Sequence, residues 1–209
     1  EKPKHGFART EMWQVVRTSV QADALELVLT LPCTPALAAL WGEFSVFLTI
    51  TVGATLSVAL KTSNLSNQTL PLSDALHSYF YVGDVEQVWV TGLENSDYLS
   101  KPENYARYQQ TGAVILRNEI DHHHVNTAQT CVIHDPVLQR ELVIEKQGSL
   151  STIVWNPGAE KAERMTDMGA GEWRSMLCIE TANTADDVVV MPPQSVHITQ
   201  TTVRVRGLS

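Results

Sequence analysis

Apolar and polar residues alternate with a period of two along much of this chain. Every second residue of 25–31 is a leucine. The alternation runs on through residues 44–52 and resumes through residues 56–60, after a turn at Gly53. Because successive side chains of a strand point to opposite faces of a sheet, this pattern predicts half-buried strands with one face on a core. The turn predicts a hairpin over residues 44–61.

Shorter runs of the same kind predict a series of further strands. They lie at residues 87–90, 114–117, 129–134, 141–145, 152–155, 175–180, 188–191 and 197–206. Many short strands joined by polar turns are typical of a sandwich or a barrel, so we predict an all-β protein. No repeat, low-complexity tract or linker interrupts them, and we expect residues 1–209 to form a single domain.

Helical signals are few. Thr34 is a suitable N-cap, Pro35 suits the first helical position, and Gly42 is expected to end a helix that continues through residues 36–41. A second helical turn is expected at residues 159–164, although it has no clear caps.

Composition and charge narrow the class of partner. The chain has 209 residues, 44% of them hydrophobic, which is enough for a packed core. Its formal net charge of −8 argues against nucleic acids and anionic membranes, since both require a clustered basic surface. No apolar run approaches the roughly 18 residues that a membrane-spanning helix needs. We therefore expect neither a nucleic acid nor a membrane as a partner.

The cysteines indicate the compartment. Cys33, Cys131 and Cys178 are an odd number and lie far apart, which fits reduced thiols better than a disulfide scaffold or a zinc site. We expect a cytoplasmic protein, although a plastid is equally compatible with this composition.

Five segments carry residues that could perform chemistry. They are His5-Gly6-Phe7-Ala8-Arg9, Leu76-His77-Ser78-Tyr79-Phe80, Asp121, Trp155-Asn156-Pro157 and Cys178-Ile179-Glu180. In this order and spacing the chain closely resembles the hexose-6-phosphate mutarotases (glucose-6-phosphate 1-epimerases) of the galactose-mutarotase-like superfamily. The resemblance extends over nearly the whole chain. It implies a large antiparallel β-sandwich, the supersandwich of that superfamily, which agrees with the alternation described above.

The hexose-6-phosphate mutarotases have a further segment before the motif that matches residues 5–9. In the family that segment supplies the first strands of the sandwich and a second arginine that contacts phosphate. This chain begins four residues before the motif. We therefore expect the N-terminal strands to be missing from the sequence given.

Interconversion of sugar anomers requires one acid and one base. A base removes the proton of the anomeric hydroxyl while an acid protonates the ring oxygen, and the open aldehyde then rotates and closes on its other face. Each positioned acid or base contributes about 10²–10⁴-fold. This chemistry needs no metal and no cofactor, and we expect none.

Glu180 is the candidate base and His77 the candidate acid. Glu180 ends the apolar run 176–179, where partial burial would raise its pKa towards neutrality. His77 lies between Leu76 and the aromatic residues Tyr79 and Phe80, and an imidazole with an ordinary pKa near 6.5 suits proton donation. Both match the catalytic residues of the resembled family. The alternatives are a strand-end carboxylate bonded to a turn and a structural core histidine.

The resemblance also implies groups that bind the sugar. Arg9 would hold the 6-phosphate, because a guanidinium forms paired charged hydrogen bonds with such groups. His5 would line the sugar pocket, and Asp121 would bind sugar hydroxyls. The alternative for Arg9 is a surface cation, and for Asp121 a loop carboxylate. Trp155 could stack on the sugar or pack in the core.

The run from Asp121 to His124 departs from the family's pattern. Strand spacing would place Asp121 and His123 on one face, as a metal site requires, and His134 is the histidine near enough in sequence to join them. A polar loop or a strand edge is the interpretation we favour for this stretch. Asp84 is expected to fix a turn after Gly83.

These observations predict a monomeric, cofactor-independent isomerase of an aldohexose 6-phosphate. Two alternatives stay open at this point. One is a mutarotase of unphosphorylated aldoses, and the other is a non-catalytic β-sandwich that binds carbohydrate or has kept the fold for a structural role.

Overall fold

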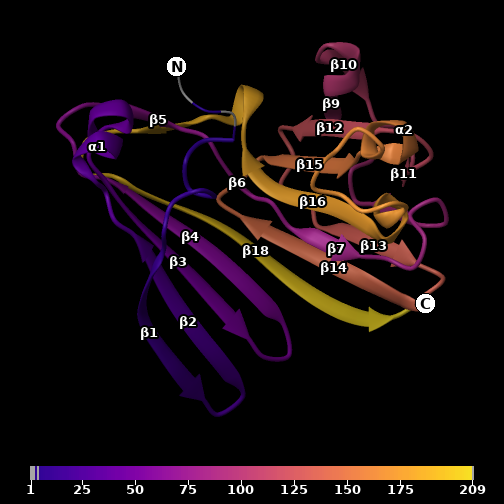
Figure 1. Ribbon diagram of the computed structural model, residues 1–209, viewed down its shortest axis with the longest axis horizontal. Coiled ribbons are helices and arrows are strands. Elements are labelled where there is room, and N and C mark those ends of the chain that lie inside the picture. Colours follow the sequence, from indigo (N-terminus) through magenta and orange to yellow (C-terminus); the bar gives the residue numbers. More distant parts are fainter. Residues whose placement is uncertain (1–2, 4, 209) are drawn as a thin grey trace.

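The computed structural model describes residue 3 and residues 5–208. Within these residues most of the chain lies in antiparallel strands, which form two large sheets and a small one (Figure 1). The larger sheet has nine strands over this part of the chain. In spatial order they are β1 (Gln14–Gln21), β2 (Ala24–Leu31), β3 (Phe44–Val52), β4 (Leu56–Asn64), β18 (Val196–Gly207), β14 (Arg140–Gln147), β13 (Cys131–Asp135), β8 (Trp89–Thr91) and β11 (Val114–Ile115).

The second sheet has seven strands among the described residues. Their order is β10 (Ala106–Gln109), β9 (Asp97–Ser100), β12 (Ile120–Val125), β15 (Ser151–Asn156), β16 (Met176–Asn183) and β6 (Asp74–Leu76), and β7 (Tyr79–Tyr81) also pairs with β16. β17 (Val189–Met191) and β5 (Leu70–Leu72) form the small sheet. The helical segments are α1 (Pro35–Trp41), α2 (Gly158–Ala162) and the 3-10 turns η1 (Lys101–Glu103), η2 (Glu172–Ser175) and η3 (Ala185–Asp187).

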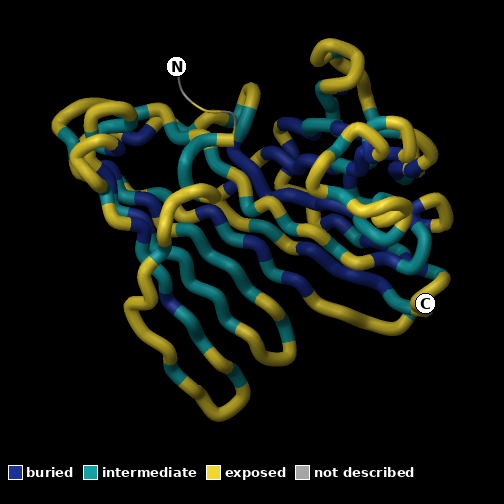
Figure 2. Tube along the Cα trace, viewed as in Figure 1, coloured by how far each residue is buried: buried dark blue, intermediate teal, exposed yellow. Residues whose placement is uncertain are grey.

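The main hydrophobic core lies between the two large sheets. Val90, Ile133 and Leu142 enter it from the nine-stranded sheet, and Leu177 and Ile179 enter it from β16. Figure 2 shows this sandwiched half of the molecule as the most deeply buried. The prediction of an all-β sandwich is therefore confirmed.

A second apolar cluster packs around α1. Leu31, Leu37 and Phe44 form it, with Phe7 and Trp41 against them. The helix has the predicted ends, because Thr34 Oγ1 accepts from Leu37 N at 3.3 Å and the chain leaves the helix at Gly42 with φ of +86°.

The hairpins of β1–β4 extend away from the sandwich, to the lower left in Figure 1. Their outer ends are covered on neither face, and Val20 and Val52 at these ends are 84% and 51% exposed. The predicted strands and the Gly53 hairpin are present. The prediction that one face of each strand lies on a core holds only near α1 and the sandwich, where Leu31 and Phe44 are buried.

Three local predictions need correction. Residues 87–88 are not in a strand, because Asp84 Oδ1 and Oδ2 bind Glu86 N and the Gln87 side chain and stabilise a turn. This is the turn expected at Asp84, and the strand starts only at Trp89.

The strand expected at 114–117 ends at Ile115. The second helix starts at Gly158, whose N–H is held by Asn156 Oδ1 at 2.8 Å.

The stretch 121–124 was expected to be a polar loop or a strand edge, and this is wrong. It belongs to β12, which pairs with β9 on one side and β15 on the other. Asp121 and His123 bind each other on one face of the sheet, and His124 Nδ1 lies 2.9 Å from Ser96 Oγ on the other. These partners offset part of the cost of burying polar groups, although the buried His122 Nδ1 and His124 Nε2 have none among the described residues.

No helix among the described residues is long and apolar enough to span a bilayer.

Candidate active site

The outer face of the seven-stranded sheet carries the candidate active site. Leu177 and Ile179 point into the core, so Cys178 and Glu180 must point the other way. Strand register then builds two rows across this face. One row is Tyr79, Cys178, Trp155 and Asp121, and the next is Glu180, Ile153 and His123. Side chains directly opposite on neighbouring strands are close enough to interact.

His77 reaches Glu180 because the chain leaves the sheet between β6 and β7. β6 ends opposite Thr181 and β7 begins opposite Cys178, so the two residues between them are released from pairing next to Glu180. The Nε2 atom of His77 lies 3.4 Å from Oε1 of Glu180. Ser78 N bonds to Leu76 O at 2.9 Å and shapes this short break.

Aromatic rings hold the imidazole in place. His77 stacks on Tyr79 with ring centroids 4.8 Å apart, and the ring of Trp155 lies nearly perpendicular to it, with centroids 6.0 Å apart. Trp155 therefore lies on the site face, and the alternative that it packs in the main core is wrong.

Glu180 is a buried carboxyl group, with 6% of its side chain exposed. Burial and the negative charge of Asp121 raise its pKa to about 8, against a smaller opposing effect of Lys101. Burial and the neighbouring His5 lower the pKa of His77. The two groups thus titrate on opposite sides of neutrality, as is common in acid–base sites.

Asp121 is held by two side chains. Its Oδ2 lies 2.8 Å from the Lys101 ammonium, and its Oδ1 lies 3.1 Å from His123 Nε2. Burial alone would raise the pKa of Asp121, but the hydrogen bonds from His123 and Lys101 outweigh it and lower the pKa. Asp121 therefore presents a fixed negative charge beside Glu180.

The N-terminal segment brings His5 and Arg9 to the same place. Phe7 anchors the segment, with its ring 5.0 Å from Trp41 and 5.3 Å from Phe44. The ring of His5 lies 6.4 Å from that of His77. Arg9 is exposed. Burial raises the pKa of Tyr79, and the charge of Arg9 opposes this rise. Burial and His5 lower the pKa of His77, and Arg9 adds a smaller effect in the same direction. Arg9 therefore lies near enough to act on both rings.

All five residues expected from the sequence thus gather at one site, although their roles stay predictions. Lys101 and Tyr79 were missed. Tyr79 was within a recognised motif, whereas no local pattern marks Lys101.

The metal interpretation fails on geometry. Asp121 and His123 share a face, as predicted, but His134 lies on β13 in the other sheet, where it binds Thr91 and Glu141. Among the described residues, no group of three or more histidine, cysteine or acidic side chains is arranged to hold a metal ion.

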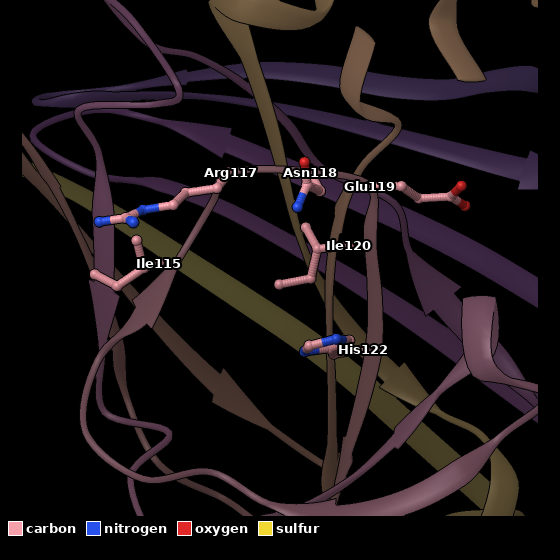
Figure 3. A pocket seen from close by; sticks show the side chains of 6 residues that line it. All are labelled: Ile115, Arg117, Asn118, Glu119, Ile120 and His122. Atoms are coloured by element: carbon pink, nitrogen blue, oxygen red, sulfur yellow. The ribbon is translucent and has the colours of Figure 1, made fainter. Parts of the chain in front are cut away.

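A hollow of about 330 Å³ lies on the opposite face of β12. Its lining is Ile115, Arg117, Asn118, Glu119, Ile120 and His122. Figure 3 shows Ile120 and His122 projecting into it from the same strand. Strand alternation directs these two side chains away from Asp121 and His123, so this hollow is separate from the candidate active site.

Comparisons with known proteins find epimerases of sugars both among family models and among curated relatives. A family model described as aldose 1-epimerase matches residues 1–203. A Cenchrus ciliaris protein named "Putative glucose-6-phosphate 1-epimerase" is 28% identical over 202 residues, which are 90% of this chain and 61% of that protein. An Escherichia coli K12 protein of the same name is 28% identical over 200 residues, 95% of this chain and 66% of its own length. The chain thus spans less than two thirds of these relatives.

Solved structures share the fold. The crystal structure of a "putative mutarotase" from Salmonella typhimurium has a TM-score of 0.89 at 26% identity, and the match covers 98% of this chain and 68% of that one. A Synechocystis protein has a TM-score of 0.80 at 20% identity, covering 99% and 70%. The second likeness concerns the fold alone.

Proposed function

Because this chain belongs to the aldose 1-epimerase family, we propose that it interconverts the α and β anomers of an aldohexose 6-phosphate. The observation that carries this proposal is the contact between His77 Nε2 and the buried Glu180 Oε1, at 3.4 Å on the outer face of the seven-stranded sheet. The names of the curated relatives support glucose 6-phosphate as the type of substrate.

In this proposal the two groups exchange protons with the sugar. Glu180 accepts the proton of the anomeric hydroxyl O1 as His77 donates a proton to the ring oxygen O5, and the C1–O5 bond breaks. After rotation about C1–C2, O5 attacks the other face of the aldehyde. His77 takes back the O5 proton and Glu180 returns one to O1, so the site ends the cycle unchanged.

The remaining groups bind the sugar. Asp121 faces the site with its oxygens oriented by Lys101 and His123, and its free lone pairs accept from sugar hydroxyls. Tyr79 and Trp155 supply apolar surface beside His77. Arg9 and His5 lie at the exposed side, where a phosphate would be accessible to a guanidinium.

The net charge of the chain opposes an anionic substrate, so a phosphate contact must be local. With a formal net charge of −8, the protein repels anions at long range. A phosphorylated sugar must therefore be held by local cations, and Arg9 meets this need. The exposed guanidinium of Arg9 at the site, and not the net charge, favours the phosphorylated substrate over a free aldose.

Exchange spectroscopy by NMR tests the proposal. The rate of α/β exchange of glucose 6-phosphate, glucose and galactose is measured with and without the protein. We expect a clear acceleration for glucose 6-phosphate and little for the other two. Arg9→Gln should raise KM for the phosphorylated sugar by about tenfold, because a charged hydrogen bond is lost.

Two outcomes would contradict the proposal. Faster exchange of galactose than of glucose 6-phosphate would indicate a mutarotase of free aldoses. Binding of sugar phosphate without any acceleration would indicate a carbohydrate-binding module.

A further inference from the structure

The chain between β9 and β10 folds back towards the candidate active site. Its last two residues, Asn104 and Tyr105, have φ values of +59° and +61°. The turn is closed by bonds from Asn104 N to Lys101 O and from Tyr105 N to Ser100 O. Left-handed backbone at a bulky residue such as Tyr105 costs roughly 1–2 kcal/mol and persists where the surroundings impose it, often at functional sites.

Two residues of this turn support Asp121, one by direct contact and the other through His123. The Lys101 ammonium binds Oδ2 of Asp121 directly at 2.8 Å. The Tyr105 ring meets His123 edge-on, with centroids 5.8 Å apart, and His123 binds the other oxygen. Strand register explains the first contact, because His122 lies opposite Ser100 and so Asp121 comes beside Lys101.

The ion pair differs from an ordinary surface pair. The Lys101 side chain is 40% exposed, whereas that of Asp121 is only 5% exposed. Exposed pairs contribute little. A buried carboxylate left without its cation is costly, so Asp121 depends on this lysine more than the lysine depends on Asp121.

We propose that Lys101 is a positioning residue of this site: its ammonium fixes Asp121 towards the sugar and offsets the negative charge that Asp121 places beside Glu180. The part concerning the sugar rests on the function proposed above. The part concerning charge is a property of the protein without substrate.

The electrostatic setting of Glu180 supports this role. Asp121 raises the pKa of Glu180 and Lys101 lowers it. Other titratable and charged groups lie near Glu180 and Asp121, on the strands and segments that surround them. They are His77, Tyr79, Cys178, His123, Tyr105, His5, Arg9 and Asp167.

The protonation of Glu180 determines whether loss of Lys101 raises or lowers the rate. Without Lys101 the charge of Asp121 is less compensated, so Glu180 holds its proton more tightly. Ionised Glu180 then becomes rarer near neutral pH, and the rate falls. At high pH Glu180 is ionised in either protein, so the difference should vanish.

Lys101→Met and Lys101→Arg test the proposal. Near pH 7, kcat/KM of Lys101→Met should fall by about tenfold, the effect of one pKa unit. The deficit should shrink above about pH 9, and the alkaline limb of the profile should move to higher pH. Lys101→Arg should keep most of the activity. The matched control is Lys161→Met, which removes a lysine bound to Glu119 at 2.6 Å outside the site and should leave the profile unchanged.

A second measurement separates this inference from the proposed reaction. Carboxyl ¹³C NMR of glutamate-labelled protein, without substrate, follows the titration of Glu180. In Lys101→Met its pKa should rise by about half to one unit, while the other glutamates keep theirs and report an intact fold. If the wild type accelerates no sugar, the proposed function fails, yet this titration still decides the role of Lys101. An unchanged Glu180 titration, or an equal loss of activity at every pH, would overturn the inference.

Discussion

At the scale of single residues, the proton balance of His77 and Glu180 governs the chemistry. The pKa of Glu180 is raised to about 8 by burial and by Asp121, and that of His77 is lowered from 6.5 by burial and by His5. Between these two values the pair holds one proton. The productive form has that proton on His77 and an ionised Glu180, so the pair must be treated as a coupled unit.

We therefore predict a bell-shaped pH dependence of kcat/KM. At low pH both groups are protonated and Glu180 cannot accept a proton. Above about pH 8 the pair loses its proton and His77 cannot donate. The maximum should lie between the lowered pKa of His77 and about 8. Anomer exchange measured over this pH range, with the uncatalysed rate subtracted at each point, gives the profile, and a flat curve would refute the pairing.

The sequence indicates some of these residues and not others. Glu180 and His77 stand in short motifs whose neighbours are apolar, so local sequence was enough to single them out. Lys101 stands in no such motif. Its role depends on the register of β9 against β12, which brings Lys101 beside Asp121. Local sequence patterns do not show which distant strands pair.

At the scale of elements, β12 shows why a polar run was misjudged. Asp121 and His123 face the site, whereas His122 stacks on Tyr98 and His124 bonds to Ser96 on the other face. The tertiary structure supplies partners for several of these polar atoms, although the buried His122 Nδ1 and His124 Nε2 have none among the described residues. Strand propensity and alternation take no account of such partners, so the run was interpreted as a polar loop or a strand edge.

A glycine turn between β14 and β15 carries the next prediction. Gly148 has φ of +65°, and a Cβ there would lie 1.9 Å from the Ile198 carbonyl oxygen. Its own carbonyl accepts from Asn183 Nδ2 at 3.0 Å and contacts His197 Nε2 at 2.8 Å. Gly148→Ala should therefore lower the free energy of unfolding by about 3 kcal/mol or more, since strain and backbone displacement add.

Gly171→Ala is the matched control for this change. Gly171 also has a positive φ, +77°, but no atom would lie within 4 Å of its Cβ. Its cost should be about 1 kcal/mol, the conformational penalty alone. Urea unfolding of the two variants compares them, and equal losses would show that the contact with Ile198 does not matter.

At the scale of the whole molecule, the two halves of the chain differ in how completely they are packed. The sandwich around β16 and β14 is buried, whereas the outer ends of β1–β4 are exposed (Figure 2). Alternation predicts β2–β4 clearly, whereas the sandwich strands β6, β7, β9, β10 and β12 were not predicted. It cannot predict how much of a face is covered, because covering depends on what packs against it.

The candidate active site belongs to the well-packed half. Glu180 pairs with Ile153 of β15 on one side. On its other side β16 pairs with β7 before Glu180 and with β6 after it, so the strand that carries the base is held close to that residue. Function can therefore be tested with conservative changes at the site face while the core stays intact.

Glu180→Gln tests the central claim most directly. The variant keeps the shape of Glu180 but cannot accept a proton, so acceleration of glucose 6-phosphate anomer exchange should fall by about 100-fold or more. Because the buried group no longer ionises, the melting temperature at high pH should be equal to or above that of the wild type. Glu145→Gln, at an exposed glutamate paired with Arg204, should exchange anomers at the wild-type rate. Near-normal exchange by a folded Glu180→Gln variant would contradict the account.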